Sequence, residues 1–195
     1  MNREDMVVKQ IEESMQLKES LRAEAKTLVA IADELVQALR RGNKVLLFGN
    51  GGSAADAQHI ACELSGRFSR DREPLPAIAL TTNTSSLTAI ANDYGYEAVF
   101  ARQLRGLVKK GDIVIGISTS GSSANVLLAI EEANRRGAVT VALTGQGGTL
   151  KELAHYVLPV SSTSTPRIQE AHITIGHIIC HLVEEELFGQ GGIPR

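Results

Sequence analysis

The feature that most constrains the fold is the alternation of short apolar runs with stretches of helical periodicity. Each of the five is a short, mainly apolar run rather than an alternation of apolar and polar residues, and they span 44–48, 76–80, 113–117, 139–143 and 156–160. Such strands are typical of a sheet that is covered on both faces. The helical stretches span 54–66, 84–91, 97–108, 123–136, 148–154 and 166–187. This alternation predicts an α/β fold with parallel strands joined by right-handed crossovers.

Two further helices are predicted before the first strand. Residues 4–22 and 23–40 both carry apolar residues at helical spacing among charged ones. The first of these helices has few partners within a chain of 195 residues, so we expect its apolar side to pack on another subunit. The length fits one compact domain over residues 1–195, with the N-terminal helices (4–40) in oligomer contacts.

Composition and charge exclude several classes of partner. The formal net charge is −2 and no basic patch or arm is visible, which argues against nucleic acid. No apolar run approaches the roughly 20 residues that span a bilayer, and the first thirty residues lack the apolar core of a signal peptide. Cys62 and Cys180 lie in apolar helical patterns that are typical of buried free thiols. We therefore expect a cytoplasmic protein with no membrane partner.

A glycine-rich turn follows the first predicted strand. Its sequence is Gly49-Asn50-Gly51-Gly52-Ser53, and Ser53 is placed to cap the helix that follows. Free N–H groups at a helix N-terminus favour an anion such as a phosphate. The turn matches neither the dinucleotide-binding G-x-G-x-x-G pattern nor the nucleotide-binding G-x-x-x-x-G-K-[ST] pattern. The turn therefore favours a small phosphorylated substrate over nicotinamide, flavin or nucleoside triphosphate.

A second candidate phosphate loop follows the third predicted strand. This serine loop runs Ser118-Thr119-Ser120-Gly121-Ser122-Ser123. One helix cap needs fewer hydroxyls than this, so we interpret the loop as a phosphate cradle rather than only a serine-rich turn. In a sheet of order 2-1-3-4-5, the first and third strands are neighbours. Both loops would then face one crevice at the carboxyl ends of these strands.

His59 and Glu63 are predicted to share one face of the helix after the glycine-rich turn, because they are four residues apart. An imidazole and a carboxylate there can share a metal ion or divide acid and base work. The last predicted helix carries Gln169 and His177, about two turns apart, so both can reach one cleft. Taken alone, a histidine among isoleucines is more often a core or interface residue than a ligand. The roles of the two other histidines of this helix stay open.

Three further polar residues allow both a structural and a functional interpretation. Asn92 and Asp93 follow a predicted helix, where they form either a C-terminal turn or a site in which Asp93 holds sugar hydroxyls. Arg67 lies four residues past Glu63 and is either an ordinary surface arginine or a partner of Glu63 or of the phosphate.

On these motifs the chain resembles the sugar isomerase (SIS) domain proteins, and most closely the bacterial sedoheptulose-7-phosphate isomerases, or phosphoheptose isomerases. The carriers of the resemblance are the glycine-rich turn, the His-x-x-x-Glu pair, Asn92-Asp93, the serine loop, and Arg167-Ile168-Gln169-Glu170 with His177. It covers nearly the whole chain. The resemblance implies a three-layer flavodoxin-like fold whose five-stranded parallel sheet has the order 2-1-3-4-5, with helices on both faces. It also implies a homotetramer with active sites near the subunit interfaces.

The resemblance further implies an aldose–ketose isomerase that converts D-sedoheptulose 7-phosphate to D-glycero-D-manno-heptose 7-phosphate, a precursor of ADP-heptose for the lipopolysaccharide core. By analogy, Glu63 and His177 are the catalytic residues that move protons between C1 and C2 through an enediol. The implied cofactor is one zinc ion per subunit, with the ligands His59, Glu63, Gln169 and His177. The predicted contacts with the phosphorylated seven-carbon sugar are Asn50, Gly51, Gly52, Ser53, Glu63, Arg67, Asn92, Asp93, Ser118, Thr119, Ser120, Ser123 and Gln169.

The chain departs from the family pattern at one position. The family often has an aspartate three residues before the glutamine, where this chain has Pro166. A role of that aspartate in opening the sugar ring would pass to Asp93 or to a water. A related SIS protein binds the bacterial replication initiator DnaA and does not keep the acid/base pair. Since Glu63 and His177 are both present here, we favour the enzyme over this alternative and over a phosphosugar-sensing domain.

Overall fold

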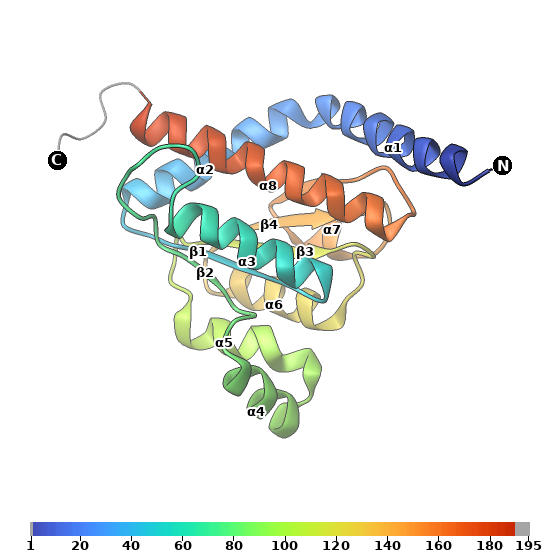
Figure 1. Cartoon of the computed structure of the whole chain (residues 1–195). Coiled ribbons are helices and arrows are strands. Elements are labelled where there is room, and N and C mark those ends of the chain that lie inside the picture. Colours follow the sequence, from blue (N-terminus) through green and yellow to red (C-terminus); the bar gives the residue numbers. More distant parts are fainter. Residues whose placement is uncertain (1, 190–195) are drawn as a thin grey trace.

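The computed structural model describes residues 2–189, and its centre is a sheet of five parallel strands (Figure 1). The strands are β1 (Val45–Gly49), β2 (Ala77–Ala79), β3 (Ile113–Ser118), β4 (Val139–Thr144) and β5 (Tyr156–Pro159). Their order is β2-β1-β3-β4-β5, and every neighbouring pair is parallel. The predicted flavodoxin-like sheet of order 2-1-3-4-5 is therefore confirmed.

Helices cover both faces of the sheet (Figure 1). One face is covered by α2 (Ala25–Arg40), α3 (Gly52–Ser65) and α8 (Thr165–Phe188), and α1 (Arg3–Ser20) lies outside α8 on that side. The other face is covered by α4 (Thr84–Tyr94), α5 (Val99–Leu107), α6 (Ala124–Arg135) and α7 (Leu150–Leu153). Two 3-10 turns, η1 (Leu21–Glu24) and η2 (Tyr96–Ala98), precede α2 and α5. The two predicted N-terminal helices thus run into one another without a loop.

Successive residues of the central strands enter different cores. Leu47 and Ile115 pack towards α2, α3 and α8, whereas Leu46 and Phe48 pack towards α5 and α6. The Phe48 ring stacks on Phe100 of α5 with ring centroids 5.1 Å apart. Since each face of the sheet meets a helical layer, the central strands carry apolar residues towards both faces, as the sequence predicts.

The predicted helices are found with their bounds shifted by one to three residues, and two of these shifts affect candidate site residues. The helix predicted to end at residue 91 continues to Tyr94, so Asn92 and Asp93 lie in its last turn rather than after it. It ends because Gly95, with φ of +86°, takes a conformation that side chains disfavour. The helix after β1 begins at Gly52, so Ser53 is not the predicted N-cap but a buried residue of the first turn.

The two cysteines occupy different environments. Cys180 is buried as predicted, and burial raises the pKa of its thiol to about 12. Cys62 is exposed in this chain, so its predicted burial is wrong. The apolar residues of α3 do not all face the core, which is why the pattern misplaced it. Within residues 2–189, no helix has the length and hydropathy needed to span a bilayer.

Candidate active site

Side chains of α3 and α8 converge in a group of three potential metal ligands. Nε2 of His59 lies 3.0 Å from Oε1 of Glu63 and 3.3 Å from Nε2 of His177. One ligand atom from each residue lies within 4.8 Å of the others. The predicted pairing of His59 with Glu63 on one helix face is therefore found, and His177 joins it from the last helix.

The close approach of α3 and α8 explains this convergence. The two helices lie side by side and run in the same direction (Figure 1). A Cβ on Gly176 would lie 2.6 Å from Cδ1 of Ile60, so a larger residue there would force the Ile60 side chain or the helix to shift. Gly176 and Ile60 immediately adjoin His177 and His59 in the sequence. The tight contact of Gly176 with Ile60 therefore lies directly beside the pair of histidines.

The loop after α3 contacts the three converging residues through Phe68 and Arg72. The ring of Phe68 lies 5.8 Å from the His177 ring and 6.4 Å from that of His181, between centroids. The backbone N–H of Phe68 donates to the carboxylate of Glu184 at 3.3 Å. The Arg72 guanidinium donates to the carbonyl oxygen of Glu63 at 2.8 Å and, through Nε, to Glu184 at 3.0 Å.

Glu184 anchors this loop through a buried charge. Its carboxylate also accepts hydrogen bonds from the backbone N–H groups of Ser69 at 2.9 Å and Arg70 at 3.1 Å. Burial alone would raise the pKa of Glu184, but the hydrogen bonds from Ser69, Arg72 and Phe68 outweigh it and lower the pKa to about 2. The carboxylate is therefore ionised at neutral pH, and the loop that carries Phe68 is held against α8.

Asp56 lies one turn before His59 and was not singled out from the sequence. Its Oδ2 atom is buried without a hydrogen-bond partner in the described part of the chain. Burial raises the pKa of Asp56 to about 6, against the attraction of His59. Its spacing in the sequence could have identified it. Asp56 lies three residues before His59 and seven before Glu63, so all three share one helix face.

The two histidines whose roles the sequence leaves open have different environments. His172 is completely buried, and burial lowers its pKa to about 4, with the Thr144 backbone acting in the opposite direction. It is therefore a neutral core residue at physiological pH. His181 is exposed one turn after His177, with its ring near Phe68.

Gln169 faces the glycine-rich turn in this structure. A Cβ on Gly52 would overlap the Gln169 amide, so the two residues are in close contact. His177 lies eight residues further along α8, about 12 Å at the helical rise. Gln169 thus lies near the predicted phosphate site, and a turn of its side chain towards His59 would be needed for the predicted fourth ligand.

The glycine-rich turn and the serine loop begin at adjacent strand ends. Gly49 at the end of β1 pairs with Ile117 near the end of β3. A Cβ on Gly49 would lie 2.7 Å from Cβ of Ser53 and 2.9 Å from the carbonyl oxygen of Ile117, so the turn requires glycine there. The two loops therefore lie next to one another, as expected from the sheet order.

Hydroxyl groups of the serine loop gather at its centre. Oγ of Ser118 lies 2.9 Å from Oγ of Ser123 and 3.4 Å from Oγ of Ser120. The Ser122 hydroxyl donates to Ser120 at 3.1 Å. Thr119 is half-buried beside them. These hydroxyls precede α6, whose N-terminus adds free N–H groups suited to an anion.

The remaining predicted site residues lie at the rim or outside these groups. Asn92 and Asp93 are exposed, and the Asn92 amide donates to Asp93 at 2.9 Å. Arg67 is exposed after the end of α3 and, within residues 2–189, forms no ion pair with Glu63. Pro166 occupies the first turn of α8, where a missing N–H leaves no helical hydrogen bond unmade.

The three converging residues fit a divalent metal ion. Two imidazoles and one carboxylate are ligand types that zinc takes in catalytic sites, where further positions stay open. The side chain of His59 is 47% exposed and that of Glu63 is 21% exposed, so a substrate can approach from solvent. The arrangement can thus combine a metal with groups able to transfer protons.

Comparison with known proteins agrees with this geometry. The model of the SIS domain family matches residues 9–145. The phosphoheptose isomerase of Aquifex aeolicus is 58% identical over 162 residues, which cover 83% of this chain and 85% of the relative. That of Roseiflexus sp. is 55% identical over 184 residues, 93% of each chain. The solved structure of phosphoheptose isomerase GmhA from Neisseria gonorrhoeae has a TM-score of 0.89 at 41% identity, covering 94% of this chain and 100% of that one.

The fold, the paired loops and these matches define a SIS domain protein. Within that class, the chain belongs to the phosphoheptose isomerases, a family of isomerase enzymes. The resemblance found in the sequence motifs is therefore confirmed.

Proposed function

We propose that this chain interconverts D-sedoheptulose 7-phosphate and D-glycero-D-manno-heptose 7-phosphate. The observation that carries the proposal is the convergence of His59, Glu63 and His177 in a chain of this family. An aldose–ketose isomerisation must remove a carbon-bound proton next to a carbonyl and return one to the neighbouring carbon. That chemistry needs a base, an acid and stabilisation of the enediolate charge.

Glu63 and His177 are the groups proposed to transfer the protons. Glu63 would take a proton from C1 of the ketose while His177 gives one to the C2 oxygen, which forms the enediol. Glu63 would then return a proton to C2 as His177 takes one from the C1 oxygen, which forms the aldose and restores both groups. Both side chains are partly exposed towards solvent, so a substrate can reach them. The Phe68 ring, 5.8 Å from the His177 ring between centroids, is proposed to restrict the rotation of the imidazole.

We propose zinc as the metal, one ion per subunit, with His59, Glu63 and His177 as ligands and Gln169 as the fourth. When bound, zinc would polarise the substrate carbonyl and stabilise the enediolate. A carboxylate that binds a metal loses part of its basicity. A dual role of Glu63 therefore requires that its second oxygen remain available to the substrate.

The phosphate end of the substrate is proposed to lie between the glycine-rich turn and the serine loop. Ser53, Ser118, Thr119, Ser120 and Ser123 would surround it. The adjoining strand ends and the gathered hydroxyls support this placement. His59 follows Ser53 by six residues, about 9 Å along α3. This separation suits a sugar phosphate of seven carbons whose C1 and C7 ends occupy different parts of the cleft.

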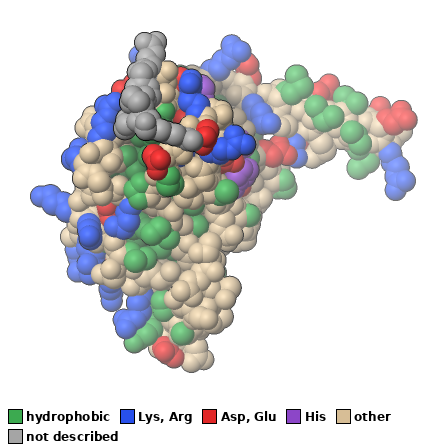
Figure 2. Space-filling view, turned by 60° about the vertical axis from the view of Figure 1, so that its left-hand side comes forward, with side chains coloured by type: hydrophobic (Ala, Val, Ile, Leu, Met, Phe, Trp, Pro, Cys, Tyr) green, Lys and Arg blue, Asp and Glu red, His purple; other side chains and the backbone are tan. Residues whose placement is uncertain are grey.

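We further propose that the protein is a cytoplasmic homotetramer that supplies heptose for ADP-heptose and the lipopolysaccharide core. The support for assembly is α1, which projects from the body with hydrophobic side chains along it (Figure 2). Val7, Ile11 and Met15 are 60%, 56% and 65% exposed. An apolar helix face of this kind is stable in water when another subunit covers it.

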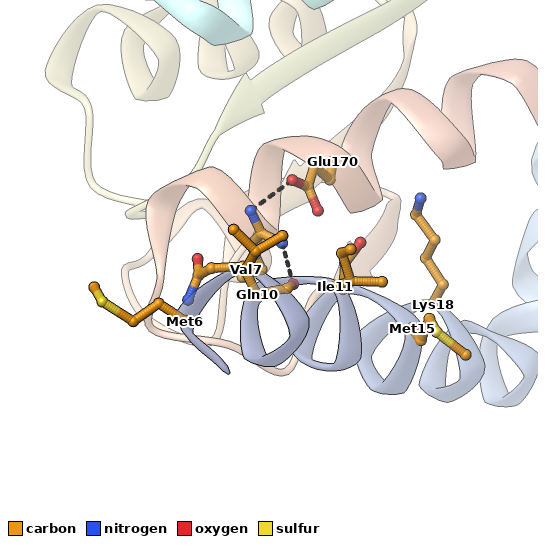
Figure 3. Close-up of a pocket in the computed structure, with 9 residues that line it drawn as sticks. Met6, Val7, Gln10, Ile11, Met15, Lys18 and Glu170 are labelled. Atoms are coloured by element: carbon orange, nitrogen blue, oxygen red, sulfur yellow. Dashed lines mark hydrogen bonds and ion pairs between the residues drawn. The ribbon is translucent and has the colours of Figure 1, made fainter. Parts of the chain in front are cut away.

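The groove beside this face lies between α1 and α8 (Figure 3). It has a volume of about 580 Å³, and Val7, Ile11 and Glu170 line it. Arg167 connects the two helices, because its guanidinium donates to the carbonyl oxygen of Gln10 at 2.8 Å and pairs with Glu170 at 2.7 Å. Arg167 and Glu170 flank Gln169 in the sequence, so a subunit bound here would lie close to the site.

The proposal is tested by isomerisation in deuterium oxide. The purified protein is incubated with D-sedoheptulose 7-phosphate, and the aldose product is examined by NMR and mass spectrometry. The enediol route predicts deuterium at C2 of the product. A product formed at the enzymatic rate without any solvent deuterium would contradict proton exchange through these exposed side chains.

The alternative is a SIS protein that binds the replication initiator DnaA without catalysis. The presence of both Glu63 and His177 in one cluster favours the enzyme. Binding of the sugar phosphate without turnover, together with capture of the initiator, would support the alternative instead.

A further inference from the structure

Two asparagine amides join the glycine-rich turn to the helix after the serine loop. Nδ2 of Asn50 donates to Oδ1 of Asn125 at 2.9 Å, and Nδ2 of Asn125 donates back to Oδ1 of Asn50 at 2.9 Å. Asn50 directly follows β1, and Asn125 lies in the first turn of α6. The two residues are 75 positions apart in the chain. Their paired hydrogen bonds form a bridge between the two loops that are proposed to hold phosphate.

The bridge is buried at Asn125, and its acceptor atom on Asn50 is fully hydrogen-bonded. Asn125 is only 4% exposed, so an amide group left unpaired there would lose its hydration without replacement. The hydroxyl of Tyr96, in η2, donates a third hydrogen bond to Oδ1 of Asn50 at 3.2 Å. Oδ1 of Asn50 then accepts two hydrogen bonds, which is the capacity of a carbonyl oxygen.

Because Oδ1 of Asn50 is fully hydrogen-bonded, the Asn50 amide can offer a ligand only an N–H donor. Its Nδ2 atom carries two hydrogens, and the bridge uses one of them. The second N–H can only donate a hydrogen bond. A phosphate oxygen accepts hydrogen bonds, whereas a sugar hydroxyl can both donate and accept. The free N–H of the bridged amide can therefore bind a phosphate oxygen, which needs a donor and offers none.

We propose that Asn125 is a positioning residue for substrate binding, which acts through Asn50. It fixes the distance between the glycine-rich turn and the serine loop and directs the free N–H of Asn50 at the phosphate. This inference rests on the proposed function, in which the two loops hold the phosphate. Asn125 was not among the residues predicted from the sequence.

The test compares two leucine variants of the same helix. Asn125→Leu keeps the approximate size of the side chain and removes both hydrogen bonds of the bridge. Asn134→Leu is the matched control, because the Asn134 amide also makes two hydrogen bonds, to the carbonyl of Leu153 at 2.7 Å and from the hydroxyl of Thr140 at 2.8 Å. It lies at the opposite end of α6, away from both loops.

Binding of inorganic phosphate is measured by calorimetry, and KM and kcat are measured with the sugar phosphate. We expect Asn125→Leu to weaken phosphate binding and raise KM by about tenfold, the effect of one lost or misplaced hydrogen bond. We expect kcat to change less than KM, because Asn125 does not touch the reacting carbons. Asn134→Leu should lower the melting temperature and leave both affinities at the wild-type values.

The outcomes separate this inference from the proposed function. Phosphate binding needs no turnover, so an inactive wild type would refute the isomerase while the two variants still test the bridge. Equal phosphate affinity in wild type and Asn125→Leu, or an equal loss in both variants, would overturn the inference. If Asn125→Leu does not fold, Asn125→Ser takes its place, since it also removes both hydrogen bonds of the bridge and keeps a polar side chain at this buried helix start. It should also weaken phosphate binding by about threefold or more, and an unchanged affinity would overturn the inference.

Discussion

Nε2 of His177 lies 3.3 Å from Nε2 of His59, although 118 residues separate them in the chain. Two imidazole nitrogens at this distance cannot both carry a proton along the line that joins them. One must accept, or both must direct lone pairs at a shared cation. With Oε1 of Glu63 at 3.0 Å from His59, the second arrangement gives a metal three ligands.

This arrangement predicts that the purified protein binds zinc in a ratio of about one ion per chain. His59→Ala and His177→Ala should each lower the zinc content at least tenfold, because two ligands hold zinc far less tightly than three. Elemental analysis after dialysis measures the content. His181→Ala is the control, since His181 lies one turn along α8 and outside the cluster. Full zinc content in His59→Ala would show that the metal lies elsewhere or is absent.

The buried pair of Glu184 and Arg72 predicts a pH-dependent stability. The folded-state pKa of Glu184, about 2, lies below its ordinary value of 4.5. The ionised carboxylate therefore stabilises the fold fully above pH 4.5, and this contribution is lost as the pH falls from 4.5 towards 2. Its size is on the order of 3 kcal/mol. Urea unfolding between pH 7 and pH 3 should show the decline.

Glu184→Gln should lower the free energy of unfolding at pH 7 by about 3–5 kcal/mol, since it leaves the Arg72 charge buried without a partner. Glu184→Gln should also make the free energy of unfolding less dependent on pH between pH 7 and pH 3. Glu185→Gln is the matched control, because Glu185 forms an exposed ion pair with Arg70 at 2.6 Å. It should leave stability near the wild-type value. Equal effects of the two substitutions would refute the role assigned to the buried pair.

Two glycine substitutions should have opposite effects on stability. Gly49→Ala places a Cβ within 3.0 Å of the backbone oxygens of Ser53 and Ile117, so the glycine-rich turn must shift. We expect a marked fall in melting temperature and loss of phosphate binding. Gly106 lies inside α5 with nothing within 4 Å of an added Cβ. Gly106→Ala should stabilise the protein by about 0.5–1 kcal/mol, and thermal unfolding of both variants measures the contrast.

The exposed face of α1 predicts that assembly depends on its apolar residues. Ile11 is 56% exposed in the isolated chain. Ile11→Asp places a charge in the proposed contact and should convert the proposed tetramer to smaller species. Multi-angle light scattering after gel filtration reports the mass, and Glu12→Ala, an exposed neighbour on the same helix, is the control. A wild type that is monomeric at micromolar concentration would refute the assembly.

The sheet and the pairing of His59 with Glu63 could be predicted because both depend on local sequence patterns. Short, mainly apolar runs indicate strands covered on both sides, and the spacing of His59 and Glu63 places them on one helix face. The convergence with His177 was expected only through the family resemblance. It depends on the packing of α8 against α3, beside the contact of Gly176 with Ile60, which no local pattern reveals.

The parts that were missed depend on contacts between distant residues. Asn125 lies within a serine-rich helix start and is distinguished only by its bond to Asn50. Phe68 and Glu184 are brought together across 116 residues by the packing of a loop on α8. Tertiary packing also decides which side of α3 is exposed, so the apolar pattern could not show that Cys62 faces solvent.

The most direct measurement of the central claim is the turnover of D-sedoheptulose 7-phosphate by wild type and Glu63→Gln, followed by NMR. Glutamine keeps the size of Glu63 and its contact with His59 but cannot accept a proton from carbon. We predict that wild type forms the aldose phosphate and that Glu63→Gln binds the substrate but reacts at least about 100-fold more slowly. Equal rates in the two proteins, or a wild type that binds the sugar phosphate without converting it, would contradict the account.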